Sequence, residues 1–296
     1  MQCQVLANAI VSASTFVLVG LGFNLIYRTT RFFHFAHGAV LTAGAYLVLL
    51  LTSISGGKTW FGIVSCGLVS SVICAGLGIT LDATVFRGLR RRGASGLVLL
   101  LVSLGLYVVI QNVISLAFGD ATRSIRPMAV DEPFVVLGAR VTSVQLATVL
   151  VGFTLVILVW LVLARTRIGR AVRALANDPE LARVSGVAGD RVVLCVFAIG
   201  SFLAAVAGIL MALDTDMVPT MGMNALLAGV VAVIIGGTRS TLGIAAGALV
   251  LGLAQHFGMW YLGSVWRDGI TFGVLLVFLL VRPQGVFGGR MGRVAT

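Results

Sequence analysis

Charged residues are scarce in this sequence of 296 residues. Only 10% are Asp, Glu, Lys or Arg, and the acidic residues number ten. An enzyme active site needs titratable or nucleophilic side chains gathered in one place, and Asp82 is the only acid inside a long apolar run. We therefore predict no catalytic residue and no enzymatic activity in this chain.

Cysteine is also rare, at four residues. Cys3, Cys66, Cys74 and Cys195 lack the spacing of metal ligands and mostly lie within apolar runs, where a free cysteine behaves as a small packing residue. Lys58 is the only lysine, so the chain has no lysine-rich tail of the kind that binds nucleic acid. The sequence predicts no metal site, no cofactor and no nucleic-acid partner.

Apolar residues dominate the chain instead. Hydrophobic residues make up 59% of it, and the mean hydropathy is +1.08. A soluble domain of this length could not bury so much apolar surface, whereas a bilayer removes the need to do so. The predicted fold class is all-α: a polytopic membrane helix bundle in which residues 1–296 form a single transmembrane domain.

The apolar runs give the number of membrane crossings, because a helix needs about 20 residues to cross a bilayer. The first run is too long for the core of a cleaved signal peptide, and we expect it to remain as the first span. The run 225–236 is too short for a straight crossing, so a broken or re-entrant helix there would reduce nine crossings to eight. The runs are 5–27, 33–52, 61–85, 97–118, 143–164, 192–213, 225–236, 242–260 and 270–281.

Basic residues divide unevenly between the gaps that separate these runs. The net charge is +11, and one alternating set of gaps holds 16 basic residues while the other holds five. Basic residues concentrate in cytoplasmic loops, so we assign the first set to the cytoplasm. The N-terminus is then outside, the C-terminus is cytoplasmic, and the protein is a multi-pass protein of the cell (inner) membrane.

Glycine is abundant, at 37 residues, within or beside nearly every apolar run. Glycine lets membrane helices approach each other closely, and we favour this packing role for most of them. The stretch 236–243 differs, because glycines and small hydroxyl residues interrupt an otherwise continuous apolar run. Gly236 and Gly237 are therefore predicted to lie at a helix break beside a solute path.

Residues 119–142 form the only sizeable extracytoplasmic loop of the predicted topology. The loop mixes acidic and basic residues and contains Pro127 and Pro133. It is long enough for a short surface helix or a cap, and its mixed charge suits contact with a soluble partner. An ordinary solvated connection is the alternative.

His34 and His37 stand at the start of the second apolar run, among phenylalanines. Ionisable side chains at membrane depth usually face a bundle interior or water, and a spacing of three predicts that both lie on one helix face. A proton relay or metal site is one interpretation. We favour a neutral histidine hydrogen-bonded between helices, because no carboxylate accompanies the pair. Asn24 is likewise expected to hydrogen-bond between helices.

The stretch Ser55–Thr59 superficially matches the end of a phosphate-binding loop. That motif requires another glycine five positions before Gly57, where this chain has Thr52. The motif also requires a strand-to-helix turn, whereas this stretch lies in a short loop between two apolar runs. We predict no nucleotide site in this chain.

The gap at 165–191 is the one place where the sequence becomes strongly polar. Its basic residues place it on the cytoplasmic side. A structured, charged loop of this length between two spans is typical of a docking site for a soluble protein. Its arginines are Arg165, Arg167, Arg170, Arg173, Arg183 and Arg191.

A short helix is predicted inside this loop. Asp178 can cap the free amides, Pro179 fits the first helical position, and Glu180 suits the positive end of the helix dipole. Gly186 suits the end of the helix. The caps therefore predict a compact helix between 178 and 186.

Leu181 and Val184 give this short helix a narrow apolar edge. Such a helix could lie in the headgroup layer of the bilayer. Its short length, good caps and mixed polarity favour insertion into a groove on a soluble partner.

The segment 171–187 resembles the cytoplasmic coupling loop of permease subunits in the branched-chain amino acid ABC transporter family. Three further stretches fit that family at the expected positions. They are Phe-His-Phe-Ala-His-Gly at 33–38 with Gly-Ala-Tyr at 44–46, Ile-Gly-Gly-x-x-Ser-x-x-Gly at 235–243, and Arg-Pro-Gln-Gly-Val-Phe-Gly at 282–288. The resemblance covers nearly the whole chain, and its specificity lies in the order and spacing of the stretches together.

The resemblance implies one of two transmembrane subunits of an ATP-driven importer for branched-chain or other hydrophobic amino acids. Its partners would be a second, homologous permease subunit in a heterodimer, cytoplasmic ATP-binding subunits and an extracytoplasmic substrate-binding protein. We predict that the contact with the ATP-binding subunits is made by Arg170, Arg173, Asp178, Pro179, Glu180, Leu181, Arg183, Val184 and Gly186. We predict that the translocation path involves Asn24, His34, His37, Gly38, Gly236 and Gly237.

The chain departs from the family pattern at four places. His34 stands where asparagine is usual, Arg28 where a small residue is common, Thr238-Arg239 replaces a small apolar pair, and Leu242 stands where proline is frequent.

Urea and short-chain amide permeases share the architecture and remain the alternative. The rival from another class is a transporter or channel that works without ATP, and the third option is a purely structural membrane subunit. Few charges lie within the spans, which disfavours a transporter or channel that works without ATP. The elaborate cytoplasmic loop disfavours a purely structural subunit.

Overall fold

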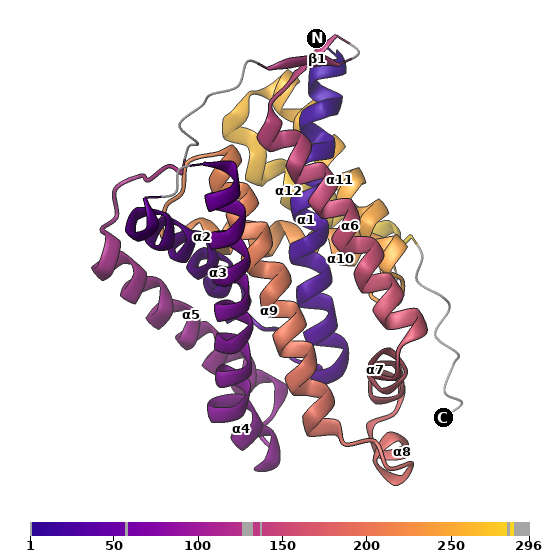
Figure 1. Ribbon diagram of the computed structural model, residues 1–296. Helices are drawn as coiled ribbons and strands as arrows, with labels where there is room; N and C mark the ends of the chain where they lie inside the picture. The colour runs from indigo at the N-terminus through magenta and orange to yellow at the C-terminus, as the bar shows by residue number, and fades with distance from the viewer. Residues whose placement is uncertain (1, 57–58, 126–132, 137, 283–284, 287–296) are drawn as a thin grey trace.

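The computed structural model describes residues 2–56, 59–125, 133–136, 138–282 and 285–286. Nearly all of its regular structure is helical, which confirms the predicted all-α class (Figure 1). The helices are α1 (Gln2–Thr30), α2 (Ala36–Ser55), α3 (Trp60–Leu81), a π-helical turn (Asp82–Phe86), α4 (Arg87–Arg91), α5 (Gly96–Phe118), α6 (Ser143–Arg165), α7 (Arg167–Asn177), α8 (Pro179–Val184), α9 (Gly189–Asp214), α10 (Met221–Gly236), α11 (Thr241–Leu262), a 3-10 turn (Ser264–Trp266) and α12 (Arg267–Val281). The strands are β1 (Phe134–Val136) and β2 (Ala139–Val141).

Eight helices in the described part of the chain are long and apolar enough to cross a membrane. Two of them include short extensions: Trp60–Arg91 continues α3 through the π-helical turn into α4, and Ser264–Val281 joins the 3-10 turn to α12. The ninth apolar helix, α10, has only 16 residues. The predicted break follows it, because Gly237 takes a positive φ of 88° and α11 begins only at Thr241. The expected set of eight long helices and one short, interrupted helix is confirmed.

Polar residues in the gaps begin several of these helices. The side chains of Thr59, Ser95 and Ser240 each accept a hydrogen bond from the amide three residues further on. Thr142 does the same and forms a capping box with Gln145. The first amides of a helix have no partner within the helix, so these caps fix where the chain starts each new span.

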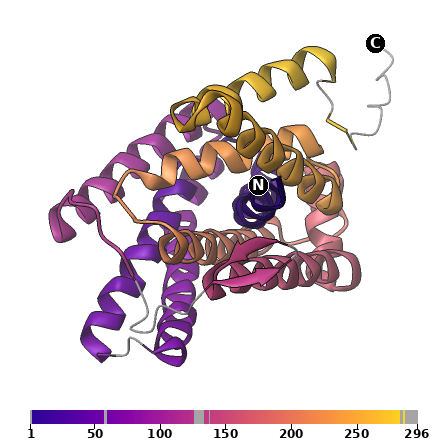
Figure 2. The ribbon, with the colours of Figure 1, turned by 90° about the horizontal axis from the view of Figure 1, so that it is seen from above.

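Helix α1 forms the centre of the bundle. It packs against α6, α9, α10 and α11, and Figure 2 shows it end-on among the other helices. Its side chains Leu18, Val19 and Ile26 are completely or almost completely buried. By contrast α3, α5, α6 and α12 expose many large apolar side chains on their outer faces. A bilayer, or another membrane subunit, would cover these faces.

Close backbone contacts at glycines allow the helices to cross around α1. A Cβ on Gly20 would lie 2.8 Å from a carbonyl oxygen of α10, and one on Gly22 would lie 2.8 Å from a carbonyl oxygen of α9. On α2, a Cβ on Gly38 would lie 2.7 Å from the carbonyl oxygen of Gly222 in α10. These distances are too short for a carbon–oxygen contact, so larger residues would force the helices apart. The predicted packing role of glycine is confirmed at these crossings.

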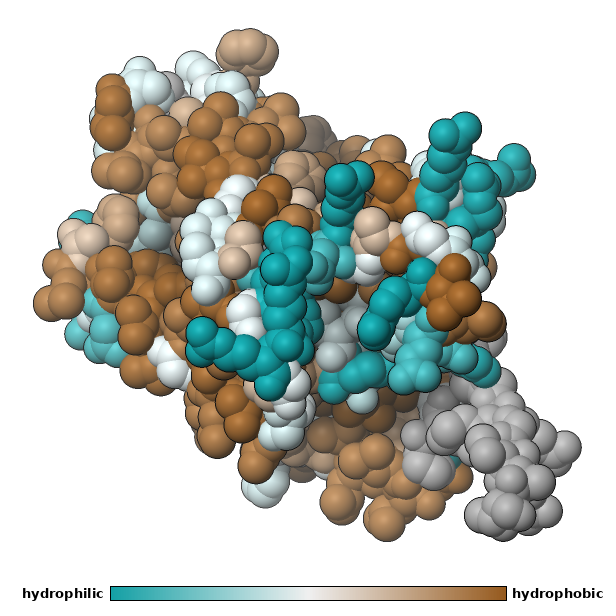
Figure 3. Space-filling view, turned by 90° about the horizontal axis from the view of Figure 1, so that it is seen from below, coloured by the Kyte–Doolittle hydropathy of each residue, from teal (hydrophilic) through white to brown (hydrophobic). Residues whose placement is uncertain are grey.

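The two ends of the bundle differ in their content of arginine. α4, α7 and α8 all lie toward the lower end in Figure 1, with α4 on the left and α7 and α8 on the right, and we call this the arginine-rich end. Figure 3 looks onto it and shows hydrophilic side chains gathered over the middle, with apolar side chains around them. The N-terminal end of α1 and the two strands lie at the opposite end. Arginines and apolar surface are thus distributed as a membrane-spanning bundle requires.

The described part of the 119–142 segment is a cap on the opposite end. β1 and β2 form an antiparallel hairpin. The Gln4 side chain of α1 donates to the carbonyl oxygen of Arg140 at 3.0 Å and accepts from its amide at 2.8 Å. Arg123 pairs with Met217, which follows α9. The expected cap is present as a hairpin and not as a surface helix; residues 126–132 lie outside the described residues.

Candidate functional site

The first half of the polar loop is α7, a helix that was not predicted from the sequence. Thr166 caps it by accepting from the amide of Gly169 at 3.1 Å. Apolar residues three to four positions apart would have indicated this helix. Its buried residues are Gly169, Val172, Leu175 and Ala176, and its exposed arginines are Arg167, Arg170 and Arg173.

Two arginine side chains hold α7 against the bundle. The Arg31 Nη2 donates to the carbonyl oxygen of Ala176, and the Arg173 Nη1 donates to the carbonyl oxygen of Leu163 in α6. Arg31 directly follows α1 and has a φ of 58°, a left-handed conformation that is uncommon outside glycine. α7 is therefore joined both to the central helix and to α6, and a displacement of α7 would act on both.

Helix α8 begins and ends as its sequence predicts. The Asp178 Oδ1 accepts from the amides of Glu180 at 2.9 Å and Leu181 at 3.0 Å. Pro179 occupies the first position of the helix. Gly186 follows the helix end with a φ of 81°, the conformation that terminates helices most readily at glycine. The predicted capped helix is confirmed as a structure.

The apolar edge of α8 faces away from the rest of the chain. Ala182 is buried, whereas Leu181 is 63% exposed and Val184 is 86% exposed. The charged residues Glu180 and Arg183 beside them are exposed too. α8 therefore presents two apolar side chains in a charged surround at the arginine-rich end. Their contact with an ATP-binding subunit stays a prediction.

Four arginines from the end of α1, from α7 and from the break after α10 lie near each other. Arg28 of α1 is close enough to Arg31, Arg173 and Arg239 for their charges to repel. Within the described ranges, none of the four forms an ion pair with a carboxylate. A cluster of like charges without a counterion favours an anionic partner surface. We call these four residues the arginine cluster.

Ion pairs join α4 to the π-helical turn and to the start of α9. The Arg90 Nη1 lies 2.6 Å from the Oδ1 of Asp82, whose side chain is completely buried. The Asp190 Oδ2 lies 3.0 Å from Arg87 Nη2 and 2.8 Å from Arg91 Nη2. The sequence identified Asp82 as an acid inside an apolar run but indicated none of these pairs. Because Asp190 comes shortly after α8, these pairs hold one end of the polar loop in place.

The break after α10 lies against the central helix. The Asn24 Nδ2 donates to the carbonyl oxygen of Thr238 at 3.1 Å. Thr238 lies between α10 and α11, so Asn24 bonds to the break and not, as expected, to another helix. The Gly236 backbone lies so close to Gly243 that a Cβ would overlap it. The structure thus brings together Asn24, Gly236 and Gly237, which sequence analysis had selected separately.

The chain after α12 also reaches this break. The amide of Val286 donates to the carbonyl oxygen of Ile235 at 2.8 Å. Gly285 takes a φ of 77°, and a Cβ there would lie 2.7 Å from the amide nitrogen of Gly237. Sequence analysis noted the 282–288 stretch but not its contact with α10. Residues 283–284 and 287–288 of that stretch lie outside the described residues.

The two histidines do not share a helix face, which corrects the prediction. His34 lies in the connection between α1 and α2, and only His37 belongs to α2. The chain is not yet helical at His34, so the spacing of three does not align the rings along one helix. The His34 ring lies among aromatic rings, 5.8 Å from Phe32 and 5.1 Å from both Phe86 and Phe197 between centroids.

The surroundings of His34 disfavour the charged form of its ring. Burial lowers the pKa of His34 well below its usual value, and the nearby His37 lowers it further. Neither ring nitrogen of His34 has a hydrogen-bond partner among the described residues. The favoured neutral histidine is thus supported, but aromatic packing, not a hydrogen bond between helices, surrounds it.

The predicted translocation residues lie inside the subunit, not at an open path. They surround the crossing of α1 with α2 and α10, where the backbones are in contact at glycines. None of them lines the cavities described below, so their role in translocation stays a prediction. The buried residues concerned are Asn24, His34, His37, Gly38, Gly236 and Gly237.

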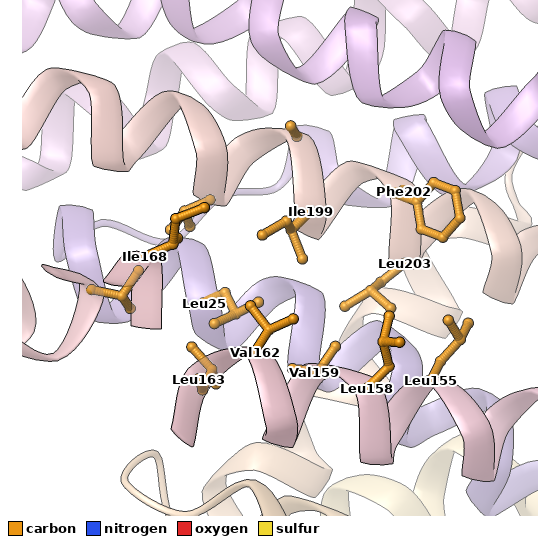
Figure 4. A pocket seen from close by; sticks show the side chains of 13 residues that line it. Leu25, Leu155, Leu158, Val159, Val162, Leu163, Ile168, Ile199, Phe202 and Leu203 are labelled. Atoms are coloured by element: carbon orange, nitrogen blue, oxygen red, sulfur yellow. The ribbon is translucent and has the colours of Figure 1, made fainter. Parts of the chain in front are cut away.

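Two cavities on the flanks of the bundle have apolar walls. The first, of about 270 Å³, lies between α1, α6, α7 and α9, and Figure 4 shows aliphatic side chains such as Leu25, Val162 and Ile199 pointing into it. The second, of about 360 Å³, lies between α3, α6 and α9. Walls without charged groups cannot hold the ionic groups of a polar solute. These cavities suit the acyl chains of the bilayer.

Comparison with known proteins gives the family. Over residues 5–280 the chain matches the family described as branched-chain amino acid transport system / permease component. It is 29% identical to the high-affinity branched-chain amino acid transport system permease protein LivH of Escherichia coli (strain K12), with 96% of this chain and 95% of that protein covered. It is 28% identical, with the same coverage, to the corresponding permease protein BraD of Pseudomonas aeruginosa.

A solved structure agrees with the fold. PsaBC from Streptococcus pneumoniae, in complex with Fab, has a similar fold with a TM-score of 0.50 and 14% identity, over 95% of this chain and 92% of that chain. At this identity the similarity concerns the fold alone. The family match, in contrast, covers the centre of the bundle, the polar loop and all the spanning helices. The chain belongs to the family of permease components of branched-chain amino acid transport systems.

Proposed function

We propose that this chain is the transmembrane permease subunit of an ATP-driven importer for branched-chain or other hydrophobic amino acids. Family membership supports a transport role, and the sequence has no nucleotide motif of its own. ATP hydrolysis therefore takes place in partner subunits, and this chain acts without catalysing a reaction. The second permease subunit is a homologue of this chain, and the two form a heterodimer across the path.

The observation that carries this proposal is the exposed apolar edge of α8, and the arginine cluster supports it. Leu181 and Val184 are exposed, and the four arginines have no carboxylate partner among the described residues. A soluble subunit with an apolar groove and an acidic rim would satisfy both features at once. Movement of that subunit would reach the centre of the bundle through α7 and its arginine anchors.

The arginine-rich end is the cytoplasmic end in this proposal, because basic residues concentrate on that side. The N-terminus then lies outside and the C-terminus in the cytoplasm. The hairpin and the 119–125 segment face outward, where a substrate-binding protein would meet them. ATP-dependent movement of this subunit would admit the solute from that protein and release it at the other end.

Two other functions make different predictions. A urea or short-chain amide permease would use the same partners but would not be inhibited by hydrophobic amino acids. A transporter without ATP would move solute as an isolated chain. The described spans contain few charged groups of the kind that ion-coupled transporters use, which favours the ATP-driven importer.

Purification from the native membrane in mild detergent tests the partners. We expect the tagged chain to recover an ATP-binding subunit and a second, homologous permease in stoichiometric amounts, as identified by mass spectrometry. Recovery of the chain alone, with solute transport in vesicles that contain no ATP, would contradict the proposal.

A further inference from the structure

A cavity at the end opposite the arginine-rich end differs from the two apolar ones. It has a volume of about 400 Å³ and lies where the connection from α9 to α10 meets α11 and α12. Its walls combine an amide, hydroxyls and charges of both signs with apolar side chains. Ligand pockets of small molecules have volumes of this order and few polar groups in an apolar lining.

One wall of the cavity holds a buried amide with an unused acceptor. Gln255 of α11 is 2% exposed, and its Nε2 donates to the Thr271 Oγ1 at 2.5 Å. That hydroxyl donates in turn to the carbonyl oxygen of Arg267 at 2.9 Å. The Gln255 Oε1 has no partner among the described residues. A buried acceptor left without a donor is costly, so a ligand that brings an N–H group would be favoured here.

Charged side chains of both signs line the same cavity. Arg267 and Asp268 begin α12, and Asp216 lies across from them on the connection between α9 and α10. All three side chains are exposed. A carboxylate suits the guanidinium of Arg267, and an ammonium group suits the two carboxylates. A zwitterion would therefore meet side chains of both signs on this wall.

Apolar side chains form the rest of the wall. Phe16 of α1, Ala225 and Ala228 of α10 and Phe272 of α12 face the same space. They can take up an aliphatic side chain but offer nothing to the hydroxyl groups of a sugar. The cavity thus has a charged part and an apolar part side by side.

We propose that this cavity is a binding site for the zwitterion of a hydrophobic amino acid at the outer end of the permease. Arg267 binds the carboxylate, Asp216 and Asp268 bind the ammonium group together with the Gln255 Oε1, and the apolar wall takes the side chain. The exposure of the charged groups makes this a weak site, suited to a solute in transit. The inference rests on the proposed function, since it places the solute of that importer at named residues.

Thiol protection in the complete transporter tests the site. Asn224 is exposed and lines the cavity, whereas the native Cys3 is exposed at the same end but does not line it. In an Asn224→Cys variant, an impermeant thiol reagent added from outside should label both residues, which also tests the orientation of the chain. We expect millimolar L-leucine to slow labelling of the Asn224→Cys thiol several-fold and to leave labelling of Cys3 unchanged, as followed by peptide mass spectrometry.

Matched variants and ligands test whether the charged groups of the cavity bind leucine. Arg267→Gln should raise the leucine concentration needed for half protection at least tenfold, whereas Arg140→Gln, which removes the same charge at the same end outside the cavity, should not change it. The amide of N-acetyl-leucine, which carries neither charge, should not protect. Normal labelling of Cys3 in each variant shows that the subunit is assembled.

The possible outcomes of this labelling experiment distinguish a failure of the proposed binding site from a failure of the proposed importer function. Leucine uptake by the Asn224→Cys transporter without any protection by leucine would overturn the site and leave the importer intact. Equal protection by leucine and by the uncharged amide would also overturn it, because the charged groups would then have no role. Protection that depends on Arg267, in a transporter that takes up no leucine, would uphold the site and refute the proposed function.

Discussion

Aspartate at both Leu181 and Val184 is expected to abolish ATP-driven uptake while the protein still inserts and folds. Both side chains are exposed in this subunit, so the change disturbs little of its own packing. In the assembled transporter the same positions would lie in a groove of the ATP-binding subunit, where two carboxylates would be buried without partners. We expect affinity for that subunit to fall about 100-fold, or about 3 kcal/mol.

Binding of the purified ATP-binding subunit to the permease in nanodiscs measures this effect. Val135→Asp is the matched control, because Val135 is an apolar residue with 71% exposure on the hairpin at the opposite end. It should leave the affinity unchanged. Wild-type affinity and uptake in the Leu181→Asp, Val184→Asp double variant would refute the role of α8 as the docking helix.

Alanine at Asp82 is expected to destabilise the subunit by about 3 kcal/mol. Asp82 is completely buried and pairs with Arg90, whose side chain is 18% exposed. Removing the carboxylate would leave the guanidinium largely buried without a counterion, which costs more than the loss of a surface ion pair. Thermal unfolding in detergent measures the change.

Asp190 provides the control for this prediction. It also pairs with arginines, but its side chain is 37% exposed, so Asp190→Ala should cost less than about 1 kcal/mol. A second check removes both partners: Asp82→Leu with Arg90→Met should recover most of the stability, because an apolar pair can replace a buried ion pair. Equal destabilisation by Asp82→Ala and Asp190→Ala would contradict the distinction between the buried pair and the exposed one.

The elements that local chemistry determines could be predicted from the sequence. The length of each apolar run gave the spans, and the Asp-Pro-Glu order with a following glycine gave both ends of α8, since caps depend on neighbouring residues alone. The break after Gly236 was predictable for the same reason. α7 was missed because its apolar residues are few and its arginines dominate the composition, although its threonine cap and spacing were present.

Contacts between distant residues could not be predicted in this way. Nothing in the sequence indicates that Asp190 pairs with Arg87, or that Val286 reaches back to α10. A glycine indicates that some backbone comes close but not which one, so the crossing of Gly38 with Gly222 required the structure. His34 was placed on a helix because a spacing of three is a helical pattern only where the chain is helical.

We expect this chain to move hydrophobic amino acids only when its partners hydrolyse ATP. Uptake of radiolabelled L-leucine into proteoliposomes that contain the complete co-purified transporter and its binding protein tests it most directly. We expect uptake that requires ATP, that is inhibited by excess isoleucine or valine, and that urea does not affect. Leucine uptake at the same rate without ATP, or ATP-driven uptake of urea that leucine does not inhibit, would contradict it.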